Sequence, residues 1–324
     1  MGLLMAIPLI QDIQAQGWKL RAFAVKLTVF VLLCLALDRL AADFLEKGLS
    51  HSYGLDIPAE VLCIGHSHTA LGIDRMVLEQ ELGVPVAKYA LNGANVADRL
   101  AMIRHYTDRQ PSSVKVLIYD VDAHVFTGAG LSVNSYTRFY PFMDSPSVDR
   151  YVRQHATFTD YSTRHALKLR RFDLETCNAS VRGWLQIDAN FKQGMVDAER
   201  LKKEIAAGRI RHISFDEDYL KCFDETLQYT AQKGIHVVLV YIPTIDLLNE
   251  AEPEKYKQAI HTLQEFAKKY GHVTLLDYCS AFAHRHDLFY DPVHLNPRGQ
   301  KAVTERLAQD IKPLTTGTPG CQAR

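Results

Sequence analysis

The chain has 324 residues, 47% hydrophobic and 23% charged, which is enough to bury the core of one large domain or two smaller ones. Its 37 lysines and arginines balance 37 aspartates and glutamates without a polybasic run, so composition argues against a nucleic-acid partner. The six cysteines lack metal-ligand spacing, and nothing in the spacing of Cys177, Cys222, Cys279 and Cys321 requires a disulfide.

The N-terminal region contains an uncharged apolar run from Leu27 to Leu37, preceded by Lys19, Arg21 and Lys26. Counted from Ala22, this segment approaches the roughly 20 residues that a bilayer-spanning helix needs. The positive flank predicts a cytoplasmic N-terminus and an extracytoplasmic body. We therefore expect a single-pass protein of the cytoplasmic (inner) membrane, with residues 1–45 as N-terminus and signal-anchor helix.

Two other interpretations of the N-terminal region stay open. A cleaved signal peptide is one, since Leu40-Ala41-Ala42-Asp43 is compatible with a processing site. An amphipathic helix of a soluble protein is the other, because Asp38 and Arg39 end the apolar run early.

The body alternates between short apolar runs and longer stretches of helical periodicity. Strands are predicted at 60–64, 84–91, 114–121, 235–242 and 273–278, and helices at 74–82, 96–109, 214–234, 253–270 and from Pro297. Residues 65–72 are predicted as a polar turn, and Ser214 with Glu217 as a capping box. This alternation indicates an α/β fold with a parallel sheet, which we assign to residues 46–313.

The alternation breaks between residues 123 and 213, where aromatic and charged residues mix. A connection of this length is typical of a lid or a binding insertion, or has structure of its own. A helical elaboration packed on the sheet edge is the alternative. Residues 314–324, rich in Thr, Gly and Pro, are predicted as a loose tail.

Two separate stretches carry residues suited to nucleophilic acyl chemistry. Ser67 follows the first strand, where ligands of parallel sheets collect, and Asp291 and His294 share one late loop. His294 is the predicted general base for Ser67, and Asp291 would hold its other ring nitrogen. Alternatively, Ser67 is an ordinary turn residue, and the late loop only caps the last helix through Asn296 and Pro297.

The stretches Gly65-His66-Ser67-His68 and Asp291-Pro292-Val293-His294-Leu295-Asn296 resemble the first and last blocks of the SGNH (GDSL-type) hydrolase superfamily. The resemblance implies a flavodoxin-like three-layer sandwich with a five-stranded, mainly parallel sheet, here with an N-terminal transmembrane helix and a mixed, helical insertion. Ile242-Pro243-Thr244 is similar to the membrane-anchored branch. That branch includes hydrolase-like proteins of lipoteichoic acid D-alanylation and partners of membrane-bound O-acyltransferases.

The resemblance also implies where the developing oxyanion would be bound. The Ser67 and Gly93 N–H groups are the expected donors, and Asn95 or Asn92 would substitute for the Asn that the superfamily carries after its third strand. That Asn is absent between Tyr119 and His124, and His66 replaces the usual Asp before the serine. No metal and no cofactor are expected, although histidines and carboxylates cluster at His66, His68, His284, His286, Asp287, Asp291 and His294.

Three functions are compatible with the sequence. The residues point to acyl chemistry, and the resemblance implies a serine esterase or O-acyltransferase acting on a cell-envelope polysaccharide or polymer. The second function is a non-catalytic accessory protein of a membrane-bound O-acyltransferase, which the missing third-strand Asn favours. The third is a soluble α/β binding module.

Overall fold

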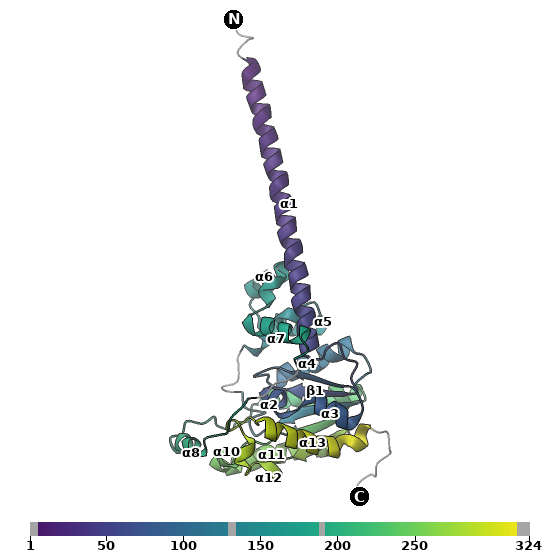
Figure 1. The fold of residues 1–324 in the computed structure, drawn as a ribbon, viewed down its shortest axis with the longest axis vertical. Helices are drawn as coiled ribbons and strands as arrows, with labels where there is room; N and C mark the ends of the chain where they lie inside the picture. The colour runs from purple at the N-terminus through teal and green to yellow at the C-terminus, as the bar shows by residue number, and fades with distance from the viewer. Residues whose placement is uncertain (1–5, 129–133, 188–191, 316–324) are drawn as a thin grey trace.

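The computed structural model describes residues 6–128, 134–187 and 192–315 (Figure 1). Its centre is a five-stranded sheet in the order β2-β1-β3-β4-β5, and all four strand pairings are parallel. The strands are β1 (Val61–Gly65), β2 (Val86–Ala90), β3 (Val116–Val121), β4 (His236–Tyr241) and β5 (Val273–Asp277). The predicted α/β fold with a parallel sheet is confirmed.

Helices cover both faces of the sheet, because alternate residues of each strand feed two separate apolar cores. Leu62 and Ile64 of β1 face one core, and Val61 and Cys63 face the other. The first core is closed by α4 (Val96–Arg109), α9 (Glu217–Gln232) and α11 (Pro253–Lys269), and the second by α3 (Arg75–Leu82) and α13 (Pro297–Thr315).

Two local predictions are wrong. The expected polar turn after β1 is a short helix, α2 (Ser67–Gly72), because the His66 ring caps it by accepting a hydrogen bond from the His68 N–H at 3.1 Å. Asp216, rather than Ser214, caps α9 by accepting from the Asp218 and Tyr219 N–H groups. Ser214 instead donates its own N–H to Thr127 Oγ1 at 3.0 Å.

The insertion between β3 and β4 is helical where the structure describes it. It contains η1 (Ser135–Phe142), α5 (Pro146–His155), α6 (Phe158–Ala166), η2 (Lys168–Arg171), α7 (Leu174–Trp184) and α8 (Ala198–Ala206). The remaining short elements are α10 (Asp246–Ala251), α12 (Cys279–Phe282) and η3 (His286–Leu288). The predicted tail lies outside the described residues except for Leu314 and Thr315, which belong to α13.

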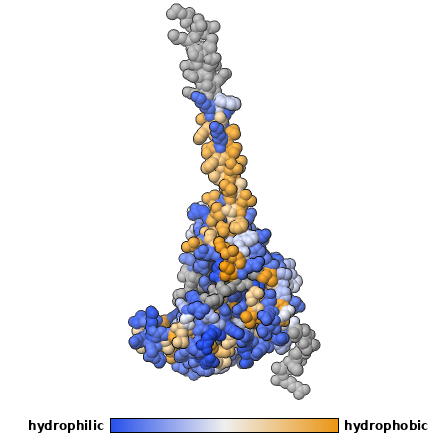
Figure 2. Space-filling view, in the orientation of Figure 1, coloured by the Kyte–Doolittle hydropathy of each residue, from blue (hydrophilic) through white to orange (hydrophobic). Residues whose placement is uncertain are grey.

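The N-terminal helix α1 runs without a break from Ala6 to Ser52. It therefore continues well past Leu37 and past the predicted boundary at residue 45. The part from Trp18 onward is long and apolar enough to cross a membrane. Figure 2 shows its apolar side chains as an exposed band that rises out of the hydrophilic body.

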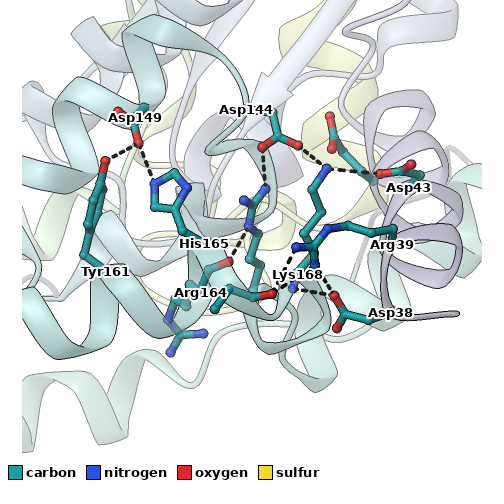
Figure 3. Close-up of polar contacts among 12 residues, drawn as sticks. Asp38, Arg39, Asp43, Asp144, Asp149, Tyr161, Arg164, His165 and Lys168 are labelled. Carbon is teal, nitrogen blue, oxygen red and sulfur yellow. Dashed lines mark hydrogen bonds and ion pairs between the residues drawn. The ribbon is translucent and has the colours of Figure 1, made fainter. Parts of the chain in front are cut away.

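The insertion holds the body end of α1. The Asp38 carboxylate accepts hydrogen bonds from the Lys168 and Leu169 N–H groups at 2.8 and 3.0 Å, and Arg39 donates to the Ala166 carbonyl at 3.0 Å (Figure 3). Together these bonds link α1 to the end of α6 and to η2. Asp38 and Arg39, which end the apolar run in the sequence, are thus residues through which α1 is bound to the folded body.

Helix α7 packs along the last turns of α1 (Figure 1). The Phe44 and Trp184 rings stack with centroids 4.8 Å apart, and Trp184 Nε1 donates to the Phe44 carbonyl at 3.1 Å. Gly48 and Gly183 permit this approach, because a Cβ on Gly183 would lie 1.8 Å from the Gly48 carbonyl oxygen. We call these contacts, from Phe44 and Gly48 to Gly183 and Trp184, the α1–α7 contact.

Candidate active site

The structure brings Ser67, His294 and Asp291 together in one hydrogen-bonded chain. Ser67 is the first residue of α2, directly beyond the carboxyl end of β1. Its Oγ lies 2.8 Å from His294 Nε2, and His294 Nδ1 lies 2.8 Å from Asp291 Oδ2 and 3.0 Å from Asp291 Oδ1. These distances are those of direct hydrogen bonds from hydroxyl to imidazole and from imidazole to carboxylate.

The loop from residue 289 to 296 presents Asp291 and His294 without help from a second loop. Phe289 and Leu295 form an antiparallel bridge across its base, and Tyr290 N–H donates to the His294 carbonyl at 2.8 Å. Asp291 Oδ1 accepts from the His294 N–H at 2.9 Å, which fixes the carboxylate relative to the ring. Asn296 caps α13 through the Arg298 and Gly299 N–H groups, so the capping alternative and the triad geometry hold at once.

Electrostatics keep the Asp291 carboxyl ionised. Burial acts to raise its pKa, but the hydrogen bonds from His294 and from the Val293 N–H outweigh that effect and hold the pKa below its ordinary value. An ionised Asp291 favours the His294 tautomer with its proton on Nδ1. In that tautomer Nε2 is an acceptor for the Ser67 hydroxyl, which is the arrangement of a general base.

The first turn of α2 leaves one N–H group for an oxyanion. Asp120 Oδ2 accepts from His66 N–H at 3.4 Å and from Thr69 N–H at 3.2 Å, and the His66 ring accepts from His68 N–H. Among the described residues, no acceptor is hydrogen-bonded to the Ser67 N–H. An unpaired N–H at a helix start, next to a nucleophile, is suited to a developing negative charge.

The other predicted oxyanion donors lie on the turn after β2. Gly93 has a φ of 74°, and Ala94 N–H donates to the Leu91 carbonyl at 3.0 Å, which makes this a tight turn. Leu91 N–H donates in turn to the Gly65 carbonyl at 3.1 Å, so the turn lies beside the start of α2. The role of Gly93 stays a prediction.

Asn95 is already engaged in structural contacts. Its Oδ1 accepts from Asp98 N–H at 3.0 Å in a capping box, and its Nδ2 donates to Ser135 Oγ at 3.2 Å. These bonds tie its amide to α4 and η1, and its predicted oxyanion role stays untested. Asn92 lies on the turn after β2 as an exposed residue.

Beneath Ser67 lies an ion pair that the sequence analysis missed. Asp120, at the end of β3, is buried, and its Oδ1 lies 2.9 Å from Arg99 Nη1. Burial acts to raise the pKa of Asp120, but the interactions with Arg99, His66 and His68 together outweigh burial and hold the pKa below its ordinary value, so the carboxyl is ionised. A Cβ on Gly65 would lie 2.4 Å from this carboxylate, so only glycine lets Asp120 approach the α2 start this closely. The available sequence signal was Asp120 near the end of an otherwise apolar strand, with Asp122 directly after it.

Two buried histidines, His66 and His68, lie next to the carboxylates of Asp120 and Asp122. His66 Nε2 and His68 Nδ1 lie 3.4 and 3.5 Å from Asp122 Oδ2, and burial lowers the pKa of His68 to about 3. His66, His68 and Asp120 also offer ligand atoms within 4.8 Å of one another, a donor set that a divalent ion could use. Arg99 already compensates the Asp120 charge, which makes this carboxylate a poorer metal ligand. His286 lies elsewhere, 2.8 Å from Asp246.

Among solved structures, the chain is similar to two enzymes of ester chemistry. One is a GDSL-like lipase from Bacteroides thetaiotaomicron, with 10% identity and a TM-score of 0.39 over 77% of this chain and 87% of the lipase. The other is a catalytic mutant of Axe2, an acetylxylan esterase from Geobacillus stearothermophilus, with 15% identity and a TM-score of 0.38 over 82% of this chain and 97% of Axe2. No family model and no curated protein matches the chain.

Proposed function

We propose that the chain is a membrane-anchored, extracytoplasmic serine esterase or O-acyltransferase that acts on ester groups of a cell-envelope glycan or polymer. The observation that carries this proposal is the continuous hydrogen-bonded chain from Ser67 through His294 to Asp291. The sequence resemblance to the membrane-anchored branch of the SGNH superfamily supports the substrate class. If the chain acts as an O-acyltransferase, its proposed partner is a membrane-bound O-acyltransferase.

The reaction follows from the three side chains. Ser67 Oγ attacks the ester carbonyl while His294 Nε2 takes the hydroxyl proton, and Asp291 stabilises the resulting imidazolium. The Ser67 and Gly93 N–H groups bind the oxyanion. Collapse expels the alcohol, which takes the proton from His294, and leaves an acyl group on Ser67. Water or an acceptor hydroxyl then attacks the acyl carbon, His294 removes its proton, and Ser67 is released with that proton returned.

The position of α1 bears on the substrate. In this proposal its apolar run spans the inner membrane, and the basic residues before it stay in the cytoplasm. Between Asp38 and Ser52 the helix continues for about 20 Å beyond the apolar run, at 1.5 Å per residue. Helix α2, which carries Ser67, lies in the folded body beyond the C-terminal end of α1 (Figure 1). A site held this far from the bilayer suits an ester on a projecting polymer better than one buried among lipid tails.

Ser67→Ala tests the enzyme proposal. The variant deletes one oxygen at a helix start, so the fold should persist while hydrolysis of p-nitrophenyl acetate falls by about 10³-fold or more. Labelling by a fluorophosphonate probe should be lost as well. Asp291→Asn should impair turnover less completely, because it keeps the nucleophile and changes only the support of His294. Ser280→Ala, at an exposed serine of α12, is the matched control and should label and turn over normally.

A non-catalytic accessory role is the second candidate, and one observation favours it. The stretch from Tyr119 to His124 at the end of β3 lacks the Asn that the resemblance implies, and its Asp120 is paired with Arg99. Complementation separates the two candidates. If Ser67→Ala, at normal protein level, fully restored envelope-polymer acylation to a deletion strain, the enzyme proposal would be wrong and the accessory role right.

A further inference from the structure

The apolar run of α1 is by itself shorter than the hydrocarbon core of a bilayer. From Ala22 to Leu37 the helix rises about 24 Å at 1.5 Å per residue, whereas that core is about 30 Å thick. Counted to Phe44, the helix rises about 35 Å. The missing length therefore lies between Asp38 and Phe44, in a stretch that also carries charge.

The insertion pairs with each charged residue of this stretch. Asp38 accepts hydrogen bonds from the backbone of η2 and lies next to Arg39, which donates to the end of α6 (Figure 3). Asp43 Oδ1 lies 3.4 Å from Lys168 Nζ, which also pairs with Asp144 at 2.6 Å. The polar side of α1 is thus covered by partners from the insertion.

The network formed by these pairs carries no net charge. It contains three carboxylates and three cations: Asp38, Asp43, Asp144, Arg39, Lys168 and Arg171. The Asp38 and Arg171 side chains are 10% and 2% exposed, so its centre is closed to the surroundings. An unpaired charge is costly in a membrane, whereas a neutral network of paired groups is compatible with a neighbouring lipid phase.

The opposite face of α1 stays apolar and open over the same stretch. Leu40 lies two residues after Asp38, about 200° around the helix, and Leu37 and Phe44 lie within about one turn of Leu40 on the same side. Leu37, Leu40 and Phe44 are 66%, 67% and 58% exposed, whereas Asp38 is buried. In Figure 2 the apolar band of α1 accordingly continues down into the upper part of the body.

The insertion adds partly exposed apolar side chains at this level. The Trp184 ring, which stacks on Phe44, is at the protein surface, and Lys47 Nζ lies 5.7 Å from its centre. Leu167 and Leu169, at η2, are also exposed. A tryptophan with a lysine beside it, at the end of an apolar helix, is typical of the boundary between acyl chains and headgroups.

We infer that the apolar face formed by Leu37, Leu40, Phe44 and Trp184, which we call the lipid face, lies in the outer half of the bilayer. The membrane boundary on this face is then at Phe44 rather than at Asp38. This placement rests on the membrane anchoring in the proposed function, and it adds a contact between the insertion and lipid. From Phe44 to Ser52 the helix continues for about 12 Å, so the body that carries the triad stays outside the bilayer.

Quenching of Trp184 by brominated phospholipids tests the lipid face. Trp18→Phe leaves Trp184 as the only tryptophan of the full chain, which is reconstituted at one chain per phosphatidylcholine nanodisc. Lipids brominated near the headgroup should quench about half or more of its emission, and lipids brominated near the chain ends should quench less. Equal Trp184 emission in brominated and ordinary lipid would overturn the inference.

The control places a tryptophan on the body. His261→Trp, at an exposed site of α11, is made in a chain with both native tryptophans replaced by phenylalanine, and its emission should be unchanged by brominated lipid. A second copy of the chain is the other occupant that would cover the lipid face. Discs that hold two chains should give the same Trp184 quenching. Loss of quenching in those discs would assign the face to the second copy and overturn the inference.

Leu40→Asp, made in the Trp18→Phe chain, places an unpaired carboxylate on the lipid face. It should reduce the quenching of Trp184 by about twofold or more, because the charge draws this face out of the bilayer. Met76→Asp, at an exposed residue of α3, should leave the quenching unchanged. Equal quenching in the two variants would contradict a contact between Leu40 and lipid.

Extraction with alkaline carbonate separates the lipid face from the anchoring itself. Release of the wild-type chain from membranes would overturn both. Retention of the chain with Trp184 unquenched would overturn the lipid face alone. Fluorophosphonate labelling of Ser67 reports on the enzyme proposal independently of either result.

Discussion

Asp120 holds the backbone on both sides of Ser67 without contacting the Ser67 hydroxyl. One carboxylate oxygen accepts from the first turn of α2, and the other pairs with Arg99 inside the protein. Burial makes this pair costly to break, because removal of one partner leaves the other charge without compensation. The ion pair between Asp120 and Arg99 therefore fixes the backbone at the start of α2.

Asp120→Asn should lower the free energy of unfolding by about 3 to 5 kcal/mol, because it leaves the Arg99 guanidinium buried and unpaired. The double variant Asp120→Asn with Arg99→Met should recover part of this loss, since no uncompensated charge remains. Urea denaturation of both variants measures the effect. A single variant within about 1 kcal/mol of wild type would show that the pair does not support the α2 start.

At the residue scale, the sequence predicted which three side chains would meet but not the ion pair that supports the start of α2. Ser67, Asp291 and His294 stand in short local patterns, and the Asp291–His294 spacing suits one loop. Arg99 and Asp120 are 21 residues apart and belong to different elements. Only the packing of α4 on the sheet shows that they meet.

The elements of the insertion are stabilised by partners that are distant in sequence. Helices α5, α6 and α7 are short, and such helices are marginal unless an apolar face is packed against a partner. Helix α5 packs on α4, and α7 and η2 pack on α1, where Asp38 bonds to a backbone group 130 residues away. This is why sequence periodicity gave no clear helices between 123 and 213, and why Asp38 seemed to end the N-terminal helix.

Gly183→Ala tests the α1–α7 contact. The added methyl would meet the Gly48 carbonyl, so the helices must separate, at a cost of about 1 to 3 kcal/mol. We expect faster proteolysis within the insertion, with fluorophosphonate labelling of Ser67 retained. Gly271→Ala is the control, because nothing lies within 4 Å of its added Cβ. Equal protease resistance of the two variants would contradict a close contact at Gly183.

For the whole molecule, buried neutral histidines make stability depend on pH. Burial lowers the pKa of His68 and of His105 to about 3 in the folded chain, against about 6.5 when unfolded. Between those values the unfolded chain binds protons that the folded chain does not. The free energy of unfolding that these two histidines contribute is therefore fully present above about pH 6.5 and is lost as the pH drops toward 3. Asp120 and Asp122 face His68 and oppose its shift, so His105 gives the simpler test.

His105 lies against Tyr89, whose hydroxyl is 3.2 Å from Nδ1, and against the Phe142 ring. His105→Gln keeps a polar group beside Tyr89 and removes the titration. Between pH 6 and pH 4 the variant should lose less stability than wild type, by up to about 1.4 kcal/mol per pH unit. His261→Gln, at an exposed position, should follow the wild-type slope. Urea denaturation of the full chain in detergent at pH 7, 6, 5 and 4 gives these slopes. Identical slopes for His105→Gln and wild type would mean that His105 takes up its proton in the folded protein as readily as in the unfolded chain.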